Sequence, residues 1–320
     1  MFAVYADSFH PDDPLAGLVI GERPDPVVPP GWQLVRVRAA SVNHHDVWTL
    51  RGVGITADRL PMILGCDAAG EDDNGDPVLV HSVIADPGYD DESMDPGRSL
   101  LSEVYQGTFA DYVAVPARNV LPLPQGFSFA EAACLPTAWL TAYRMLATRS
   151  GLRPGDTVLV QGAGGGVATA CVILARLMGF QVWVTSRDED KRAKALTIGA
   201  HAAYPSGARL PERVDAVMET VGAATWDHSL KALRPGGRVV VSGATSGTNP
   251  PADLARVFFK QLEVVGSTMG TRSELSRLVS LLTVSGTRPL IARELPMSEA
   301  AEALAAIAAG DVFGKIVLTR

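Results

Sequence analysis

The segment around residue 164 carries the residues with the most specific chemistry. A strand-like apolar stretch runs directly into a turn of small residues: Gly162, Ala163, Gly164, Gly165, Gly166 and Val167. Glycines let the backbone turn tightly and approach a pyrophosphate, and the free N–H groups at the start of a following helix face its negative charge. A turn without a ligand is the alternative, but this density of glycine costs folding entropy that a ligand would explain. The motif therefore predicts a dinucleotide site.

The end of the next predicted strand indicates which dinucleotide binds. This position, roughly 20 residues after the glycines, usually decides whether the adenosine ribose carries a phosphate. Ser186 and Arg187 can donate hydrogen bonds to a phosphate, and Lys191 follows one helical turn later. These residues favour NADPH. Asp188 keeps NADH as the less favoured cofactor, and a solvated surface charge is the alternative interpretation of Arg187.

These positions require a parallel sheet to hold them. From residue 155 onward, apolar runs rich in Val alternate with segments of helical period, which is typical of βαβ units. We expect strands at 157–161, 181–185, 214–219, 238–242 and 263–266, and helices at 166–178, 190–198, 224–233 and 252–260.

The first 115 residues indicate a different kind of unit. Pro and Gly recur every few residues, short runs at 32–37 and 77–81 are typical of strands, and no long amphipathic helix is present. Acidic residues accumulate before Arg98, and we expect an exposed acidic loop at residues 85–100. An oxygen-ligand metal site is the alternative there, although the acids are not spaced like a calcium loop. After residue 267 the pattern predicts a helix, a strand, a helix and a strand, at 273–285, 291–294, 298–309 and 315–318.

Composition limits the possible classes of protein. A chain of 320 residues with 47% hydrophobic and 20% charged residues can fill two buried cores. The net charge of −7 argues against nucleic acid as a partner. No apolar run approaches the roughly 18 residues of a membrane span, so we expect no integral membrane protein.

Cysteine usage and the N-terminus bear on the compartment. Cys66, Cys134 and Cys171 are far apart and odd in number, which does not suit a disulfide framework and favours small core residues in a reducing compartment. The first residues carry acids and no basic residue before their short apolar stretch, the opposite of a secretory signal. We expect a cytoplasmic protein.

Several further motifs, taken in order, resemble one family. They are the segments 40–52, 63–70, 107–113, 234–238, 265–270 and 314–318, together with the glycine turn. The sequence is similar to the medium-chain dehydrogenase/reductases, in particular to their zinc-independent, quinone-oxidoreductase-like branch, which includes zeta-crystallin. The resemblance implies an α/β protein: a GroES-like β-barrel catalytic domain from residues 1–137 and 267–320, and a Rossmann doubly wound parallel-sheet domain, 138–266, that binds NADP(H).

The resemblance also bears on zinc. Members that contain catalytic zinc hold it with a cysteine, a histidine and a second cysteine, and the matching positions here are Asn43, Cys66 and Thr137. An amide and a hydroxyl bind zinc poorly. The four cysteines of the family's structural zinc lobe are also missing, so we expect neither zinc. A rearranged site of Cys66 with His44, His45 or Asp67 stays open.

Without a Lewis acid, the resemblance implies hydride transfer to an acceptor that is already electrophilic, such as a quinone or an α,β-unsaturated carbonyl. Asn43 and Thr137 are expected to hydrogen-bond the substrate or the nicotinamide, and the candidates for the proton donor are His44, His45 and Asp46. An alcohol dehydrogenase with an unconventional zinc site and a non-catalytic NADPH-binding redox sensor are the alternative functions.

Family positions extend the expected cofactor site. Thr220 and Val221 follow the predicted strand at 214–219, and Ser242, Gly243 and Ala244 lie at the end of the predicted strand at 238–242. The segment next to the nicotinamide corresponds to Ser267, Thr268 and Met269. Lys315 matches a terminal lysine of the family, which either reaches a phosphate or lies on the surface of the last strand. We also expect a homodimer, joined through the sheet edge near residues 261–266.

Overall fold

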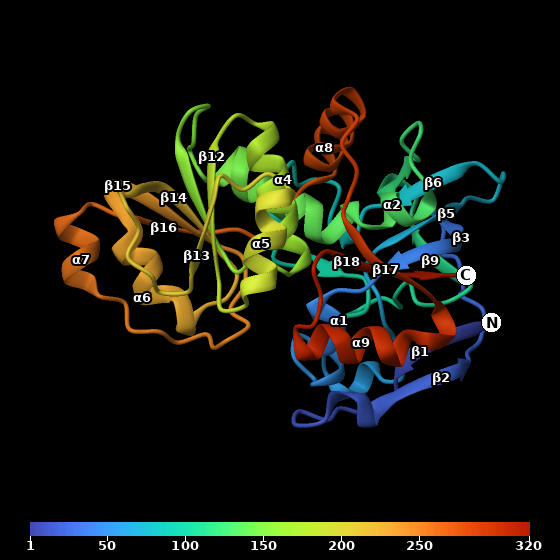
Figure 1. Cartoon of the computed structure of the whole chain (residues 1–320). Coiled ribbons are helices and arrows are strands. Elements are labelled where there is room, and N and C mark those ends of the chain that lie inside the picture. The colour runs from blue at the N-terminus through green and yellow to red at the C-terminus, as the bar shows by residue number, and fades with distance from the viewer. The chain divides into compact units, whose positions relative to one another are not determined.

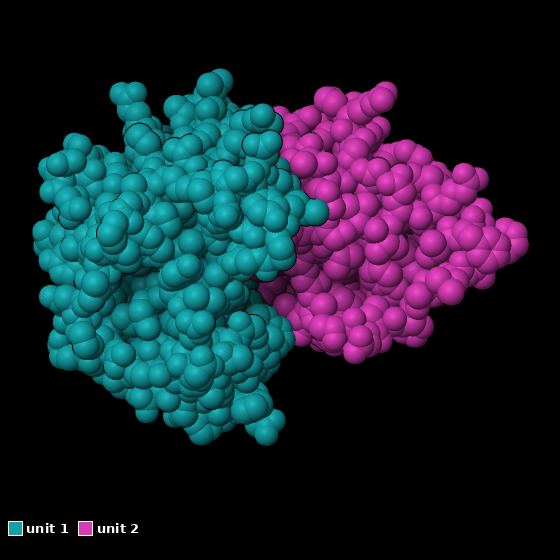
Figure 2. Space-filling model, turned by 180° about the vertical axis from the view of Figure 1, so that it is seen from behind, with its two compact units in different colours: residues 1–140, 269–320 teal, residues 141–268 magenta.

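The computed structural model describes residues 1–320, which form two compact units (Figure 2). Unit 1 combines residues 1–140 with 269–320, and unit 2 contains residues 141–268. Unit 1 is the GroES-like part and unit 2 the Rossmann part of an α/β protein, as expected. None of the helices has the length and the apolar character that a membrane span requires.

Unit 1 is built mainly from antiparallel strands (Figure 1). One sheet has the order β2-β1-β4, with bounds Leu18–Glu22, Phe2–Ala6 and Met62–Ile63. A second has the order β10-β6-β5-β3-β18-β17, with bounds Val120–Pro122, Pro77–Val80, Ala68–Glu71, Trp32–Ser41, Lys315–Thr319 and Ile291–Pro296; β9 (Tyr112–Pro116) pairs with β3. A small pair is formed by β7 (Val83–Ile84) and β8 (Ser99–Leu100). The helices are α1 (His44–Leu50), α2 (Phe129–Ala133), α3 (Leu140–Tyr143, which crosses into unit 2), α8 (Arg272–Ser285) and α9 (Ala300–Ala309).

Strand β3 joins the two chain segments of unit 1. Its side chains alternate, so that Val35 and Val37 are buried in the core while Arg36 is exposed. Near its end β3 pairs antiparallel with β18, with Ser41 opposite Val317, and the N–H of Val42 donates to the carbonyl of Ile316. This pairing brings the start of β18 beside the residues that follow β3.

The acidic segment differs from the expectation of an exposed loop. Glu92 and Asp95 are buried. The Asp95 carboxylate accepts hydrogen bonds from the backbone N–H groups of Asp86 and Gly97, which lowers its pKa, and Glu92 lies 3.4 Å from Arg118. The acids are therefore partly used to fold the segment itself.

Unit 2 is a six-stranded parallel sheet with helices on either side (Figure 1). Its order is β13-β12-β11-β14-β15-β16, with bounds Ala202–Pro205, Gln181–Ser186, Thr157–Gln161, Val214–Glu219, Leu233–Val241 and Glu263–Gly266. The helices are α4 (Gly166–Leu177), α5 (Glu189–Thr197), α6 (Ala223–Ala232) and α7 (Leu254–Phe259). The five predicted strands and four predicted helices are confirmed, with shifted ends, whereas edge strand β13 is not predicted by the sequence pattern.

Candidate functional site

Asp46 fixes the start of α1 to the loop that precedes Cys66. One carboxylate oxygen accepts a hydrogen bond from the N–H of Asn43 at 2.7 Å, and the other accepts from the N–H of Gly65 at 3.0 Å. Burial is complete and raises the pKa of Asp46 to about 6, although nearby His45 and these hydrogen bonds oppose the shift. Both oxygens are therefore used in positioning the backbone.

Asn43 connects a buried cation with a buried anion. Its Oδ1 accepts a hydrogen bond from the Lys315 ammonium at 2.6 Å, and its Nδ2 donates to Asp67 Oδ2 at 2.8 Å and to the carbonyl of Ser41 at 3.1 Å. Lys315 also donates to the carbonyl of Val42 at 2.7 Å, and its Nζ lies 3.9 Å from Asp67 Oδ2. Both N–H groups of the amide are thus occupied within the protein.

Asp67 is the acceptor at the centre of this network. Its Oδ2 accepts from Ser41 Oγ at 2.6 Å in addition to Asn43, and its Oδ1 accepts from Thr137 Oγ1 at 2.5 Å and from Ser82 Oγ at 3.3 Å. The side chain is fully buried. Burying a carboxylate is costly unless donors and a nearby cation replace the lost hydration, and here Lys315 is that cation.

Cys66 and Thr137 lie side by side. Their Sγ and Oγ1 atoms are 3.4 Å apart, and because the Thr137 hydroxyl donates to Asp67, the thiol is the donor between them. Burial and the nearby carboxylates raise the pKa of the Cys66 thiol well above its usual range. Cys66 is therefore a neutral thiol and a poor nucleophile in this setting.

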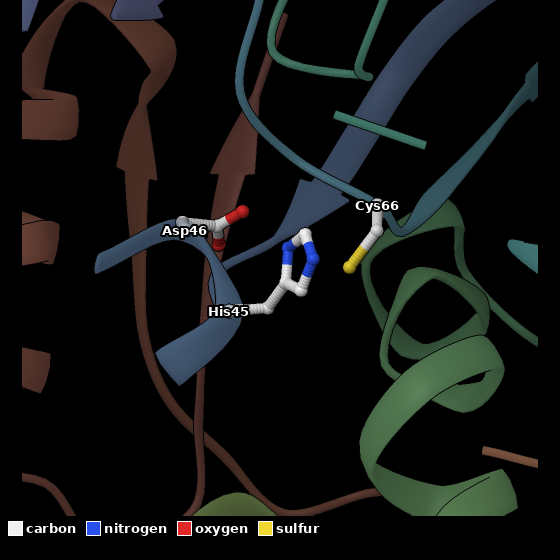
Figure 3. Close-up of side chains that lie close together, drawn as sticks. All are labelled: His45, Asp46 and Cys66. Carbon is white, nitrogen blue, oxygen red and sulfur yellow. The ribbon is translucent and has the colours of Figure 1, made fainter. Parts of the chain in front are cut away.

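His45 is the titratable residue that the network leaves available. Its ring lies between the Asp46 carboxyl group and the Cys66 thiol (Figure 3). Its Nε2 lies 3.1 Å from Glu103 Oε1, and its Nδ1 lies 3.4 Å from Ser102 Oγ. Burial lowers the pKa of His45, but the hydrogen bond to Glu103 and the neighbouring carboxylates outweigh it and raise the pKa above the ordinary value. The raised pKa favours the protonated form of His45, and about a fifth of its side chain is exposed.

His44 has the opposite character. It begins α1 at an exposed position, and its ring lies 6.3 Å from that of Trp48. Partial burial of the ring and the charge of Arg51 lower the pKa of His44. At neutral pH a smaller fraction of His44 than of His45 therefore carries the proton that a donor must give.

In unit 2, the glycine turn joins β11 to α4. Gly162 has φ +80°, a left-handed conformation that favours glycine. Gly165 has an ordinary φ of −67° at the N-cap of α4, and a Cβ placed on it would meet no protein atom within 4 Å. Because nothing in the protein requires glycine at residue 165, this open space fits the close approach of a ligand to the backbone.

After β12, Asp188 caps the next helix, whereas the Arg187 side chain points to solvent without a partner. The Asp188 carboxylate accepts from the N–H of Lys191 at 3.1 Å and caps α5, which lowers its pKa. Ser186 Oγ accepts from the N–H of Asp188 at 3.2 Å. Arg187 is exposed, and its guanidinium group has no hydrogen-bond or ion-pair partner. The acid that would favour NADH is therefore used by the helix.

Glu219 organises the loops that follow β14 and β15. Its buried carboxylate accepts from the N–H groups of Val221 and Gly222 and from the hydroxyls of Thr225 and Ser229, at 2.6–3.0 Å. Backbone hydrogen bonds then tie the two loops together, and they hold the expected cofactor residues Thr220, Val221, Ser242, Gly243 and Ala244 along the carboxyl ends of the strands. At the end of unit 2, buried Ser267 Oγ has no hydrogen-bond partner, which leaves a polar atom for a ligand.

Comparison with known proteins agrees with this architecture. Residues 29–125 match the family model described as alcohol dehydrogenase GroES-like domain, and residues 166–284 match zinc-binding dehydrogenase. A crystal structure of an NAD-dependent alcohol dehydrogenase is 32% identical with a TM-score of 0.91 over all of both chains. The chain belongs to the medium-chain dehydrogenase/reductase superfamily.

Two of the curated relatives illustrate the different activities named among them. The zinc-type alcohol dehydrogenase-like protein YogA of Leptosphaeria maculans is 29% identical over 92% of each chain. The quinone oxidoreductase of Mus musculus is 28% identical over 89% of this chain and 88% of the relative. The superfamily therefore establishes an oxidoreductase, and the choice between these activities depends on the site.

The positions that correspond to the superfamily's zinc ligands do lie together. Asn43 Nδ2 is 3.8 Å from Cys66 Sγ, and Thr137 is the third member. Only the thiol is a good zinc ligand, its thiolate is disfavoured by burial, and the amide and hydroxyl already serve Asp67. A second group, His45 with Asp46 and Cys66, has its ligand atoms within 4.8 Å of one another, but both Asp46 oxygens hold backbone N–H groups. Neither donor set fits the superfamily's zinc site.

The structure brings together all five expected catalytic residues within unit 1, but their uses differ. Asn43 and Asp46 are occupied by internal hydrogen bonds, whereas His45 has a raised pKa and is partly exposed. Lys315 follows neither expected alternative, since its ammonium is buried and bound within unit 1. Sequence reasoning missed Glu103, which lies in none of the recognised motifs. It also missed the central role of Asp67, which lies in the motif 63–70 but is expected from the sequence only as a possible metal ligand.

Proposed function

We propose that this chain is a zinc-independent NADPH-dependent oxidoreductase that reduces quinones or α,β-unsaturated carbonyls. The observation that carries the proposal is the His45–Glu103 pair, in which an imidazole with a raised pKa lies next to the group of side chains that replaces the zinc ligands. A metal-free reductase of this kind needs a proton donor rather than a Lewis acid. The name of the quinone oxidoreductase relative supports the same class of acceptor.

NADPH supplies a hydride when it is bound. The residues suited to hold it are those of the glycine turn, Arg187 for the 2′-phosphate, and the loops that Glu219 organises. His45 then gives a proton to the reduced acceptor, so that acceptor, hydride and proton together form the hydroquinone or the saturated carbonyl compound. Glu103 stabilises the imidazolium ion until that transfer occurs, and His45 regains its proton from water.

Asn43, Asp46 and Thr137 have positioning roles in this proposal. Asn43 and Thr137 hold the Asp67 carboxylate, and Asp46 holds the backbone on which His45 lies. Lys315, hydrogen-bonded to Asn43, provides the positive charge nearest to the Asp67 carboxylate.

The test combines turnover with metal analysis. Purified protein is analysed for zinc and assayed for NADPH and NADH oxidation with a simple quinone, a simple enone and a simple alcohol in the reverse direction. We expect oxidation of NADPH with the quinone or enone in the absence of bound metal. Binding of NADPH without turnover of any acceptor would instead support the redox-sensor alternative.

An alcohol dehydrogenase with an unconventional metal site is the second candidate. It is favoured by the short distances among His45, Asp46 and Cys66 and by the names of two relatives. Stoichiometric zinc, with alcohol oxidation that a chelator abolishes, would establish it and refute the first candidate.

We also propose that the chain forms a homodimer through β16. This strand is an edge of the sheet, and its Val264 is exposed together with Leu254, Phe258 and Phe259 on the preceding helix. Unpaired edge strands with apolar side chains are prone to association, which pairing with a second copy would satisfy. Light scattering at micromolar concentration tests this, and a Val264→Lys variant is expected to be monomeric.

A further inference from the structure

The connection between β13 and β14 is short for its type. Parallel strands of one sheet are usually joined by a dozen or more residues that include a helix. Here only residues 206–213 make the connection, and none of them is helical. They lead from the carboxyl end of edge strand β13, past the positions of β12 and β11, to the amino end of β14. A groove of about 620 Å³ lies beside this coil, bounded by α6 and α7.

The groove is lined by cationic side chains, two of which are paired with acidic side chains and two of which are not. The four are Arg209, Arg213, Lys231 and Arg256. Arg209 and Arg213 have no hydrogen-bond or ion-pair partner. Lys231 pairs with Asp227 at 2.6 Å and Arg256 with Asp253 at 2.7 Å, and Glu212 is the acid in the lining itself. Positive charge therefore gathers here on a chain whose net charge is −7.

The pKa of the neighbouring Lys260 responds to this positive charge. Partial burial, together with the positive charges of Arg213 and Arg256, lowers the pKa of Lys260 below its usual range. Its Nζ donates to the carbonyl of Leu233 at 3.1 Å. An anion placed in the groove would relieve the repulsion among these cations.

The coil that carries the arginines is fixed on both sides of Arg209. On one side, His228 Nε2 donates to the carbonyl of Ala208 at 2.9 Å. On the other, Leu210 packs against the hydrophobic core of unit 2. A fixed backbone reduces the entropy that a ligand loses on ordering its site.

The groove runs from the carboxyl end of β13, where Gly207 to Arg209 line it, towards the amino end of β14, and its lining residue His228 lies 2.9 Å from Gln161, which precedes the glycine turn. Arg213 immediately precedes the first residue of β14, and Lys231 lies in the last turn of α6, so both belong to the edge formed by the amino ends of the strands. The glycine turn follows the carboxyl end of β11 at the opposite edge.

We propose that this groove is a second anion site that binds a soluble diphosphate-containing ligand. Guanidinium groups match phosphate oxygens in geometry and stay charged at every physiological pH. Arg209 and Arg213 contact the phosphates, and Lys231 and Arg256 add charge from the opposite wall. The site does not depend on the reductase activity proposed above.

The test is isothermal titration of the full chain with inorganic pyrophosphate at low ionic strength. Wild-type protein is compared with the double variant Arg209→Gln/Arg213→Gln and with Arg153→Gln, an exposed arginine of unit 2 that does not line the groove. Arg187→Gln serves as the second control, because it weakens the proposed cofactor site and leaves the groove intact. Adenosine diphosphate and adenosine monophosphate are titrated in parallel.

We expect one pyrophosphate per chain, with binding weakened about tenfold or more in the double variant and changed less than about twofold in both controls. Adenosine diphosphate binding that is weakened in Arg209→Gln/Arg213→Gln and kept in Arg187→Gln would assign the groove to a nucleotide, and pyrophosphate binding alone with that pattern would assign it to inorganic polyphosphate. No binding by wild-type protein would overturn the proposal. So would equal loss in Arg153→Gln, which indicates diffuse surface charge, or loss in Arg187→Gln, which indicates binding at the glycine turn.

Discussion

The Lys315 ammonium donates a hydrogen bond to Asn43 Oδ1 at 2.6 Å, although 272 residues of chain separate the two. Asn43 in turn donates to Asp67, so the amide bridges a buried cation and a buried anion whose charged atoms are 3.9 Å apart. This arrangement occupies the place where zinc-containing members of the superfamily hold their metal.

Replacing the cation should destabilise unit 1. Lys315→Met leaves the Asp67 carboxylate buried without a counter-charge, and breaking a buried pair in this way costs about 3–5 kcal/mol. Urea unfolding of wild-type and variant protein measures the difference. Arg277→Met on the exposed face of α8 is the control and should change the free energy of unfolding by less than about 0.5 kcal/mol. An equally stable Lys315→Met protein would show that the network does not need its charge.

The pH dependence of turnover should report His45. Because its pKa is raised, the imidazolium persists above the ordinary titration range, and the rate should fall as pH rises through that raised pKa. Glu103→Gln removes the main stabilising partner, so the falling limb should move to lower pH. His44→Gln should leave the limb in place. A limb that is unchanged in Glu103→Gln would remove His45 from the proton-transfer step.

The stability of the protein should depend on pH through Asp46. Its pKa rises from 3.8 in the unfolded chain to about 6 in the folded protein, so the folded state binds more protons between these values. Stability contributed by the protonated carboxyl group is present below about pH 4 and is lost as pH rises to about 6, a change on the order of 3 kcal/mol. Wild-type protein should therefore lose stability relative to Asp46→Asn over this range. Urea unfolding at several pH values measures the difference, and parallel curves would contradict the shift.

Arg187 should discriminate between the two cofactors. Arg187→Gln removes the exposed cation at the end of β12, and NADPH should bind about tenfold more weakly while NADH changes little. Fluorescence titration with both cofactors measures this. Equal weakening for both would show that Arg187 acts on the fold of the loop rather than on the 2′-phosphate.

Two glycines of the turn should respond differently to alanine. Gly162→Ala forces a Cβ into a left-handed conformation and should lower the free energy of unfolding by about 1–2 kcal/mol. Gly165→Ala meets no protein atom within 4 Å and should leave stability unchanged. Gly165→Ala should nevertheless weaken NADPH binding, because the added methyl group fills the space proposed for the pyrophosphate. Normal binding by this variant would place the cofactor elsewhere.

The sequence predicts unit 2 better than unit 1 for a physical reason. Its central strands β11, β12 and β14 are buried on both faces and therefore appear as continuous apolar runs between helical segments, whereas β13 is a four-residue edge strand with a proline at its end and gives no such signal. In unit 1 the strands are short and pair across the chain. The pairing of β3 with β18 depends on tertiary packing that no local pattern records.

The site divides in the same way. The residues of the glycine turn are consecutive in the chain, so the motif can be recognised in the sequence. Glu103 comes from a loop after β8 and Lys315 from the start of β18, and their contacts with His45 and Asn43 appear only after folding. Asn43 occupies the predicted place, but its hydrogen bonds are set by Lys315 and Asp67, which motif spacing does not connect.

The position of β18 has a consequence for the order in which the two units can fold during synthesis. Unit 2 is one continuous stretch, residues 141–268, and its residues leave the ribosome together. Residues 1–140 leave it earlier but lack the strand that lies beside β3 and the lysine that balances Asp67. Unit 1 therefore cannot complete its sheet, or place a cation beside the buried Asp67 carboxylate, until residues 315–319 have been translated.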